Sequence, residues 1–262
     1  MAEYVLSLSY GKDSLACLGA IELLGWPLDR IVHAEVWATE TIPADLPPMV
    51  EFKAKADKII KDRYGIEVEH YRSKWTFEQA FHLVRGQSGR NTKHAGAIRG
   101  WPMTRGNWCL QYLKTSAINA VKTSPDTVHY IGIAADEPNR FGTLTDKKKS
   151  PLVERGWTEA DCMEWCIFHD LVSPIYSQST RGGCWFCHNQ SVHQLRLLRQ
   201  HYPEYWALML QWDLESPVTF RSDGRTLHDV ERRFLLEDEG FLKPGEVFHW
   251  KQLDEEPQFR LF

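Results

Sequence analysis

The stretch YVLSLSYGKDSLACLGAIELL (residues 4–24) decides the fold. Residues 4–9 have the apolar character of a short buried strand, and residues 14–24 carry leucine and isoleucine at helical spacing. A turn containing Gly11 separates the two segments. The stretch therefore predicts a strand that passes through a tight turn directly into a helix.

The same alternation continues along the chain. Strands are predicted over residues 30–37 and 66–71, with an amphipathic helix over residues 49–64 that ends at Gly65. A further buried strand is expected over residues 127–134. Strands that alternate with helices indicate an α/β fold with an open, mostly parallel sheet and helices on both faces.

The later part of the chain is predicted to be mostly helical. Thr158 followed by Asp161 is a near-match to a capping box and begins a helix over residues 158–169. Residues 191–214 also have a helical pattern. We therefore predict two regions: an α/β domain over residues 1–155, and a cysteine-bearing helical region over residues 156–262 that packs on it.

The turn after the first strand has the composition of a phosphate-binding loop. A helix that opens at a glycine turn presents free backbone N–H groups and the positive end of its dipole. Hydroxyl donors, a lysine charge and a carboxylate suited to orienting the loop or holding Mg²⁺ accompany them. The spacing does not fit the Walker A pattern. The predicted loop consists of Ser9, Tyr10, Gly11, Lys12, Asp13 and Ser14. The alternative is a plain strand–turn–helix with a capping serine.

A second polar segment follows the strand over residues 127–134. Gly132 is followed by Asp136, Glu137 and Arg140. In an open α/β sheet, ligands bind beyond the carboxyl ends of the strands, so these groups are placed for magnesium and phosphate contacts. A polar loop after a strand is common, and that remains the alternative interpretation.

The six cysteines favour a metal or redox site over disulfides in a reducing compartment. Cys184 and Cys187 form a CxxC after Gly182 and Gly183, whereas Cys162 and Cys166 lie four apart on a predicted helix. Such spacing suits either tetrahedral zinc or an iron–sulfur cluster. The alternative is a set of buried thiols without metal. His188 and His193 could replace one sulfur in a zinc site, but the favoured interpretation is that they are ordinary polar residues of a pocket or helix surface. Cys17 is expected in the core.

Taken together, these motifs resemble the PP-loop ATP pyrophosphatase superfamily, and within it the phosphoadenosine phosphosulfate (PAPS) reductase-like family. The loop resembles SGGxDS, with Tyr10 in place of one glycine. The segments around Cys109 with Lys114, from Gly132 to Arg140, and from Arg181 to Cys187 resemble further family motifs. The resemblance implies an adenine nucleotide alpha hydrolase-like fold that binds ATP or a related adenine nucleotide with Mg²⁺. It also implies that Lys114 contacts the nucleotide.

The resemblance also implies a [4Fe-4S] cluster, with zinc as the alternative. Related reductases hold a cluster on a mid-chain cysteine pair and a later CxxC. Only Cys109 stands in the mid-chain position. The predicted ligands are Cys109, Cys166, Cys184 and Cys187, and Cys166 is preferred over Cys162 because it lies nearer the helix end.

One departure from the family bears on the chemistry. Thiol-dependent sulfonucleotide reductases use a cysteine near the C-terminus, but the last cysteine here is Cys187. We therefore expect cleavage or transfer at the α-phosphate that supports sulfur transfer, with Lys12, Asp13 and Asp136 as the catalytic residues. The alternatives are a PAPS/APS sulfonucleotide reductase and a non-catalytic nucleotide- or iron–sulfur-sensing module.

Bulk composition sets the remaining expectations. The chain of 262 residues is 43% hydrophobic and 25% charged, with a net charge of −4, which argues against strong non-specific nucleic-acid binding. No apolar run of membrane-spanning length or secretion signal is evident, so we expect a cytoplasmic protein. A basic run over residues 85–105 is suited to a nucleic-acid acceptor such as tRNA or DNA, or is a solvated lid. A sulfur-donor protein is another possible partner, and the oligomeric state is left open.

Overall fold

The computed structural model describes residues 2–86, 94–102, 107–177, 182–248 and 250. The chain forms two compact units. Unit 1 comprises Met1–Thr76 and Leu110–Cys184, and unit 2 comprises Phe77–Cys109 and Trp185–Phe262. The boundary predicted at residue 155 does not coincide with this division, because residues 156–184 belong to unit 1 and residues 77–109 to unit 2.

Unit 1 contains a parallel sheet of five strands in the order β3-β2-β1-β4-β5. Every neighbouring pair is parallel, which confirms the predicted α/β class. The chain runs from β1 outward to β2 and β3, and then crosses to β4 and β5 on the other side of β1, so β1 is central. The strands are β1 (Tyr4–Ser7), β2 (Arg30–Glu35), β3 (Val68–Arg72), β4 (Val128–Tyr130) and β5 (Lys148–Lys149).

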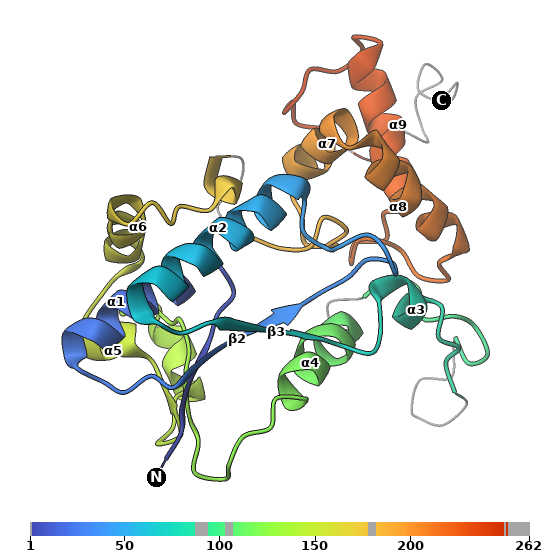
Figure 1. Cartoon of the computed structure of the whole chain (residues 1–262). Coiled ribbons are helices and arrows are strands. Elements are labelled where there is room, and N and C mark those ends of the chain that lie inside the picture. The colour runs from blue at the N-terminus through green and yellow to red at the C-terminus, as the bar shows by residue number, and fades with distance from the viewer. Residues whose placement is uncertain (1, 87–93, 103–106, 178–181, 249, 251–262) are drawn as a thin grey trace. The chain divides into compact units, whose positions relative to one another are not determined.

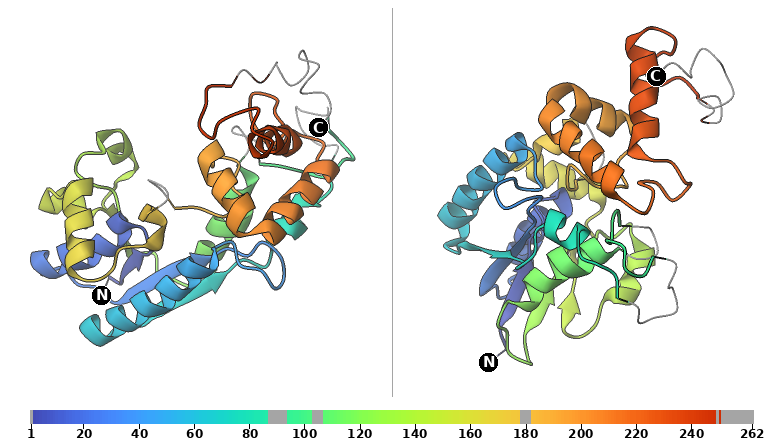
Figure 2. Two further views of the ribbon diagram at one scale, coloured as in Figure 1. Left: turned by 90° about the horizontal axis from the view of Figure 1, so that it is seen from above. Right: turned by 90° about the vertical axis from the view of Figure 1, so that its right-hand side faces the viewer.

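Helices cover both faces of this sheet, as predicted. Leu6 and Ile31 belong to a core shared with α1 and α2, whereas their neighbours Val5 and Val32 pack on the opposite face with Val121. Figure 1 shows α2 and α4 on opposite sides of β2 and β3, and the right-hand view of Figure 2 shows the same separation. The helices of unit 1 are α1 (Lys12–Leu24), α2 (Pro47–Tyr64), α4 (Ser116–Asn119), α5 (Pro151–Arg155) and α6 (Glu159–Phe168), with a π-helix at Leu110–Thr115 and 3-10 turns at Pro138–Thr143 and Pro174–Ser177.

Helix α6 joins unit 1 because it packs directly on α1. A Cβ atom at Gly19 would lie 2.1 Å from the indole nitrogen of Trp165, so the ring fills the space that a side chain on α1 would need. The predicted capping box is confirmed: Thr158 accepts from the Asp161 N–H group, and Asp161 accepts from the Thr158 N–H group. The cap fixes where α6 begins.

Unit 2 is helical with an aromatic core, and its helices are α3 (Phe77–Phe81), α7 (Val192–His201), α8 (Pro203–Glu215) and α9 (Leu227–Asp238). Trp101 and Trp212 are almost fully buried, and the indole N–H of Trp101 donates to Asp213 at 2.8 Å. Phe77 brings α3 into the same core by packing on Phe186, with ring centroids 4.1 Å apart. Within the described ranges, no helix is both long enough and apolar enough to cross a membrane.

A buried ionic group ties α7 to α9 within unit 2. The Glu237 carboxylate, only 4% exposed, accepts two hydrogen bonds of 2.6 Å from Arg196 and one of 2.9 Å from Arg233. Two guanidinium groups therefore share one carboxylate away from water. Removing one member of such a buried ionic group lowers stability strongly, because its partner is then left buried without a counter-charge.

Replacing Glu237 with alanine is expected to lower the free energy of unfolding by about 3–5 kcal/mol, because two buried guanidinium groups lose their partner. Urea denaturation measures the change. Glu239→Ala, at an exposed residue that ends the same helix, is the control and should stay within about 0.5 kcal/mol of wild type. Equal stability of the two variants would contradict the argument.

Candidate functional site

The loop between β1 and α1 is closed by its own serines. Ser14 Oγ donates to the Gly11 carbonyl at 3.0 Å and accepts from the Ser9 N–H group at 3.1 Å. Because the Ser14 proton is used on Gly11, the Ser9 hydroxyl is the donor of the 3.0 Å bond between the two hydroxyl groups. Both hydroxyls therefore shape the loop, while no side chain caps α1 at Gly11 among the described residues. The N-terminus of α1, with its positive dipole end, suits an anion.

Lys12 begins α1 and is held in an ionic network. Its ammonium nitrogen lies 2.9 Å from Asp13 and 2.9 Å from Glu159 at the start of α6. Burial alone would lower the pKa of Lys12, but these two hydrogen bonds outweigh burial and raise it, so the group stays charged. The Lys12 N–H group also donates to the Tyr176 hydroxyl at 2.9 Å.

Three carboxylates gather beside this lysine. Oxygen atoms of Asp13, Glu137 and Glu159 all lie within 4.8 Å of one another. Burial raises the pKa of Asp13, and the charges of Glu159 and Glu137 add to that rise against the effect of Lys12. The negative charge is thus only partly neutralised. Carboxylate oxygens grouped in this way are ligands that suit Mg²⁺.

The segment after β4 holds two of the predicted site residues in place. Arg140 donates to both oxygens of Glu137, at 2.8 and 2.7 Å, and the Ala134 N–H group donates to it at 3.1 Å. Burial alone would raise the pKa of Glu137, but these hydrogen bonds outweigh burial and lower it. Asp136 instead accepts from the Glu159 N–H group at 3.0 Å. Asp136 therefore anchors the start of α6 and so positions Glu159.

Glu159 was not among the residues predicted from the sequence. The signal for it was present, because Thr158 and Asp161 mark the helix start and so place Glu159 in the first helical position. The sequence does not reveal that α6 packs on α1, and this packing brings the start of α6 to Lys12. The contact joins residues 147 positions apart in the chain.

Gly132 fits where no other residue would. A Cβ atom there would lie 2.7 Å from the Ser14 nitrogen and 2.9 Å from the Asp13 carbonyl carbon, both backbone atoms. The segment after β4 therefore packs its main chain against the first turn of α1. Gly132 is therefore required for packing, and its predicted contact with the nucleotide stays a prediction.

Gly132→Ala is expected to lower the free energy of unfolding by about 1–3 kcal/mol, because the first turn of α1 must shift to admit the methyl group. Chemical denaturation measures the loss. Gly142→Ala is the matched control, since a Cβ there meets nothing within 4 Å. If both variants unfold alike, the close approach does not constrain the loop.

Tyr10, predicted to contact a ligand, is instead fully buried. Its hydroxyl donates to Asp57 on α2 and lies 3.2 Å from Nε2 of His70 on β3. The side chain therefore points into unit 1, and only its main chain belongs to the loop surface. Lys114 lies exposed on the π-helix, and no described hydrogen bond or ion pair joins it to the loop.

Three of the six cysteines lie in the core of unit 1. Cys17 on α1 and Cys162 and Cys166 on α6 are fully buried among apolar side chains. The Cys166 thiol donates to the Lys12 carbonyl at 3.5 Å, and burial raises its pKa to about 12. A thiol in this setting stays protonated when no metal is bound.

The other three cysteines are partly exposed thiols. Cys109 lies in the helical turn before the π-helix, and Cys184 and Cys187 flank a turn at Trp185 and Phe186, whose rings are buried. His188 follows directly and is 93% buried, since its exposed fraction is 7%. Its Nε2 atom has no hydrogen-bond partner among the described residues. A buried ring nitrogen without a partner has the chemistry of a metal ligand. His188 and the three thiols do not form a group close enough to hold a metal, because the group found among the described residues is Asp13, Glu137 and Glu159.

The predicted basic run lies partly outside the described residues, because Arg90, Lys93 and Arg105 are among those not described. Of the remainder, Arg85 donates to the Arg99 carbonyl, so its guanidinium supports the local backbone. Arg181, before the CxxC, also lies outside the described residues.

Comparison with known proteins yields little. No model of a known protein family matches the chain, and no curated protein matches its sequence. Among solved structures, the chain is similar to the U34-tRNA thiolase NcsA from Methanococcus maripaludis with its [4Fe-4S] cluster, at 13% identity and a TM-score of 0.37. The match covers 80% of this chain and 70% of that one. Similarity this remote decides neither activity nor ligands.

Proposed function

We propose that this chain is a PP-loop enzyme that binds ATP or a related adenine nucleotide at residues 9–14 and cleaves or transfers at the α-phosphate. The observation that carries the proposal is the position of Lys12 at the open start of α1, beside the carboxylates of Asp13, Glu137 and Glu159. A charged lysine, a helix N-terminus and a set of oxygen ligands are the groups that a polyphosphate with its cation requires.

The residues have distinct tasks in this proposal. Lys12 and the first-turn amides of α1 stabilise the charge that develops on the pyrophosphate leaving group. Asp13, Glu137 and Glu159 would hold Mg²⁺, which supplies Lewis-acid stabilisation of phosphate oxygens when bound. Arg140 keeps Glu137 ionised, and Asp136 keeps Glu159 in position. Asp136 thus acts by positioning, in place of the catalytic role expected from the sequence.

Lys12→Ala is expected to reduce pyrophosphate release from ATP by about 10²–10³-fold, because a preorganised charge at the leaving group is lost. Release is measured with purified protein, ATP and Mg²⁺ in the presence of candidate acceptors. Lys61→Ala, which removes an exposed lysine paired only with Glu67 at the surface, is the control and should keep wild-type release. Full activity of Lys12→Ala would refute the loop assignment.

We further propose that the enzyme supports sulfur transfer through a [4Fe-4S] centre, with zinc as the alternative. Cys109, Cys184 and Cys187 are retained as ligands. For the fourth ligand we propose His188 in place of Cys166, because the Cys166 thiol is committed to the core of unit 1 and the buried Nε2 of His188 has no partner in the described structure. Histidine is an established ligand of iron–sulfur and zinc sites.

Removing a ligand should release metal, and removing a core thiol should not. We expect His188→Ala, purified without oxygen, to contain less iron and sulfide than wild type, as measured by metal analysis and absorption spectroscopy. His193→Ala, an exposed histidine five residues on, and Cys166→Ser should both keep wild-type metal content. Loss of metal in Cys166→Ser with full retention in His188→Ala would restore the ligand set predicted from the sequence. Bound zinc without iron would exclude the cluster.

The acceptor is proposed by chemistry alone. A nucleic acid such as tRNA suits the basic character of residues 85–105, and a sulfur-donor protein would supply the transferred atom. Thioredoxin-dependent sulfite release from PAPS would favour the sulfonucleotide reductase. Saturable ATP binding without pyrophosphate release would favour the sensing module.

A further inference from the structure

The backbone of Tyr10 has a conformation that bulky residues avoid. Its φ angle is +58°, in the left-handed region, where Cβ comes too close to the following carbonyl oxygen. The residue lies in the middle of the loop, and its side chain is fully buried. Side-chain interactions must therefore offset the cost of this conformation.

The Tyr10 hydroxyl has two ionic partners. It donates to one oxygen of Asp57, and the second oxygen of that carboxylate lies 2.9 Å from Nε2 of His70. The hydroxyl itself is 3.2 Å from the same Nε2 atom. The other His70 nitrogen lies 3.1 Å from Glu35, at the end of β2. Tyr10 is thus connected to α2, β3 and β2 through a single hydroxyl.

The charges in this network are well defined. Hydrogen bonds to Asp57 and Glu35 raise the pKa of His70 to about 9, so its ring is a cation that donates from both nitrogens at neutral pH. Burial, aided by Asp57, raises the pKa of Tyr10, so the phenol keeps its proton. Tyr10 therefore donates to Asp57. The Nε2 atom of His70 donates both to Asp57 and to the Tyr10 hydroxyl.

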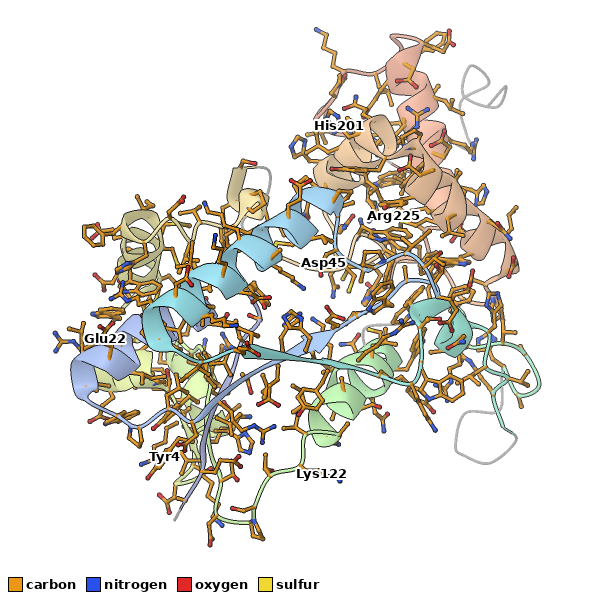
Figure 3. The ribbon with its side chains drawn as sticks, viewed as in Figure 1. Tyr4, Glu22, Asp45, Lys122, His201 and Arg225 are labelled. Atoms are coloured by element: carbon orange, nitrogen blue, oxygen red, sulfur yellow. The ribbon has the colours of Figure 1, made fainter. Side chains whose placement is uncertain are left out.

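A second histidine, His33, contacts the Tyr10 ring and the backbone just before the loop. His33 packs edge-on against Tyr10, with ring centroids 4.8 Å apart. Burial lowers the pKa of His33 to about 3, so the ring is neutral. Its Nδ1 donates to the Leu8 carbonyl at 2.8 Å, and Nε2 accepts from Lys53 at 2.9 Å. Lys53 is itself paired with Asp45, labelled in Figure 3.

We propose that Tyr10 is a positioning residue whose anchored hydroxyl holds residues 9–14 in the anion-binding shape before the nucleotide arrives. The inference rests on the proposed nucleotide site. Tyr10 does not touch the ligand; it acts through the loop backbone. Asp57 and His70 bond to its hydroxyl, and His33 packs against its ring and bonds to the carbonyl of Leu8, just before the loop. A glycine could adopt the same φ angle without cost, but it would leave the loop without this anchor.

The test compares Tyr10→Phe, which keeps the ring and removes the hydroxyl, with wild type. If the loop holds its binding shape about a tenth of the time without the anchor, the Kd for Mg-ATP rises about tenfold. We expect KM for ATP to rise accordingly, with kcat kept within about twofold once ATP saturates the loop. Tyr10→Gly should bind no better than Tyr10→Phe. In the absence of ATP, amide hydrogen exchange should accelerate in peptides covering residues 9–18 of Tyr10→Phe.

Controls separate this inference from the proposed function. Tyr64→Phe removes another hydroxyl of unit 1, bonded to Glu22 at 3.4 Å, and should leave binding and loop exchange unchanged. Asp57→Asn should reproduce the Tyr10→Phe effect, and the double variant should not add to it. Wild-type loop exchange and wild-type Kd in Tyr10→Phe would overturn the anchor. Failure of wild type to bind ATP would sink the proposed function, while loop exchange would still report on the anchor.

Discussion

The site of unit 1 depends on the close approach of two main-chain segments, the first turn of α1 and the chain that leaves β4. Because Gly132 has no side chain, its backbone reaches within van der Waals range of Ser14 and Asp13. That approach places Glu137 beside Lys12 and lets Arg140 and Asp136 act on the same group of carboxylates. A bulkier residue would move Glu137 away from Asp13 and Glu159.

The electrostatics follow from this packing. Lys12 and Arg140 bring two positive charges to three carboxylates, so one negative charge is left to be balanced within a partly buried site. Burial is the main cause of the raised pKa of Asp13, and the charges of Glu159 and Glu137 add to that rise. A divalent cation would relieve the repulsion and would in turn attract phosphate. Glu159 contributes to this excess of negative charge. Its position at the first residue of α6 is tolerated, because the helix begins there with a capped N-terminus.

Local patterns predicted the elements better than their partners. The alternation of strands and helices gave the parallel sheet, and the glycine turn gave the strand-to-helix loop, because both depend on neighbours in the chain. Strand β5 is two residues long and carries lysines, so no periodicity marks it. The assignment of Phe77–Phe81 to unit 2 depends on aromatic packing with Phe186, which is remote in sequence. Glu159, Asp57 and His70 reach the loop only through the packing of α6, α2 and β3. Ligand roles for Ser9, Ser14 and Tyr10 were inferred from residue type and stay predictions. In the structure the two serine hydroxyls bond within the loop, and the Tyr10 hydroxyl bonds to α2 and β3.

The ligand set predicted from cysteine spacing stays a prediction, and the cysteines it includes lie in different environments. Cys162 and Cys166 share a helix face, as their four-residue spacing indicated, but that face lies against α1 and not toward another thiol pair suited to a metal. Burial there favours the neutral thiol and disfavours the thiolate that metals require. The neighbourhood of Cys187 differs, because a buried imidazole nitrogen next to it lacks a hydrogen-bond partner within the described residues. Burying this nitrogen without a hydrogen bond is costly. We therefore expect a binding partner to offset that cost. The chemical environment, and not the interval between cysteines, therefore distinguishes the candidate ligands from the core thiols.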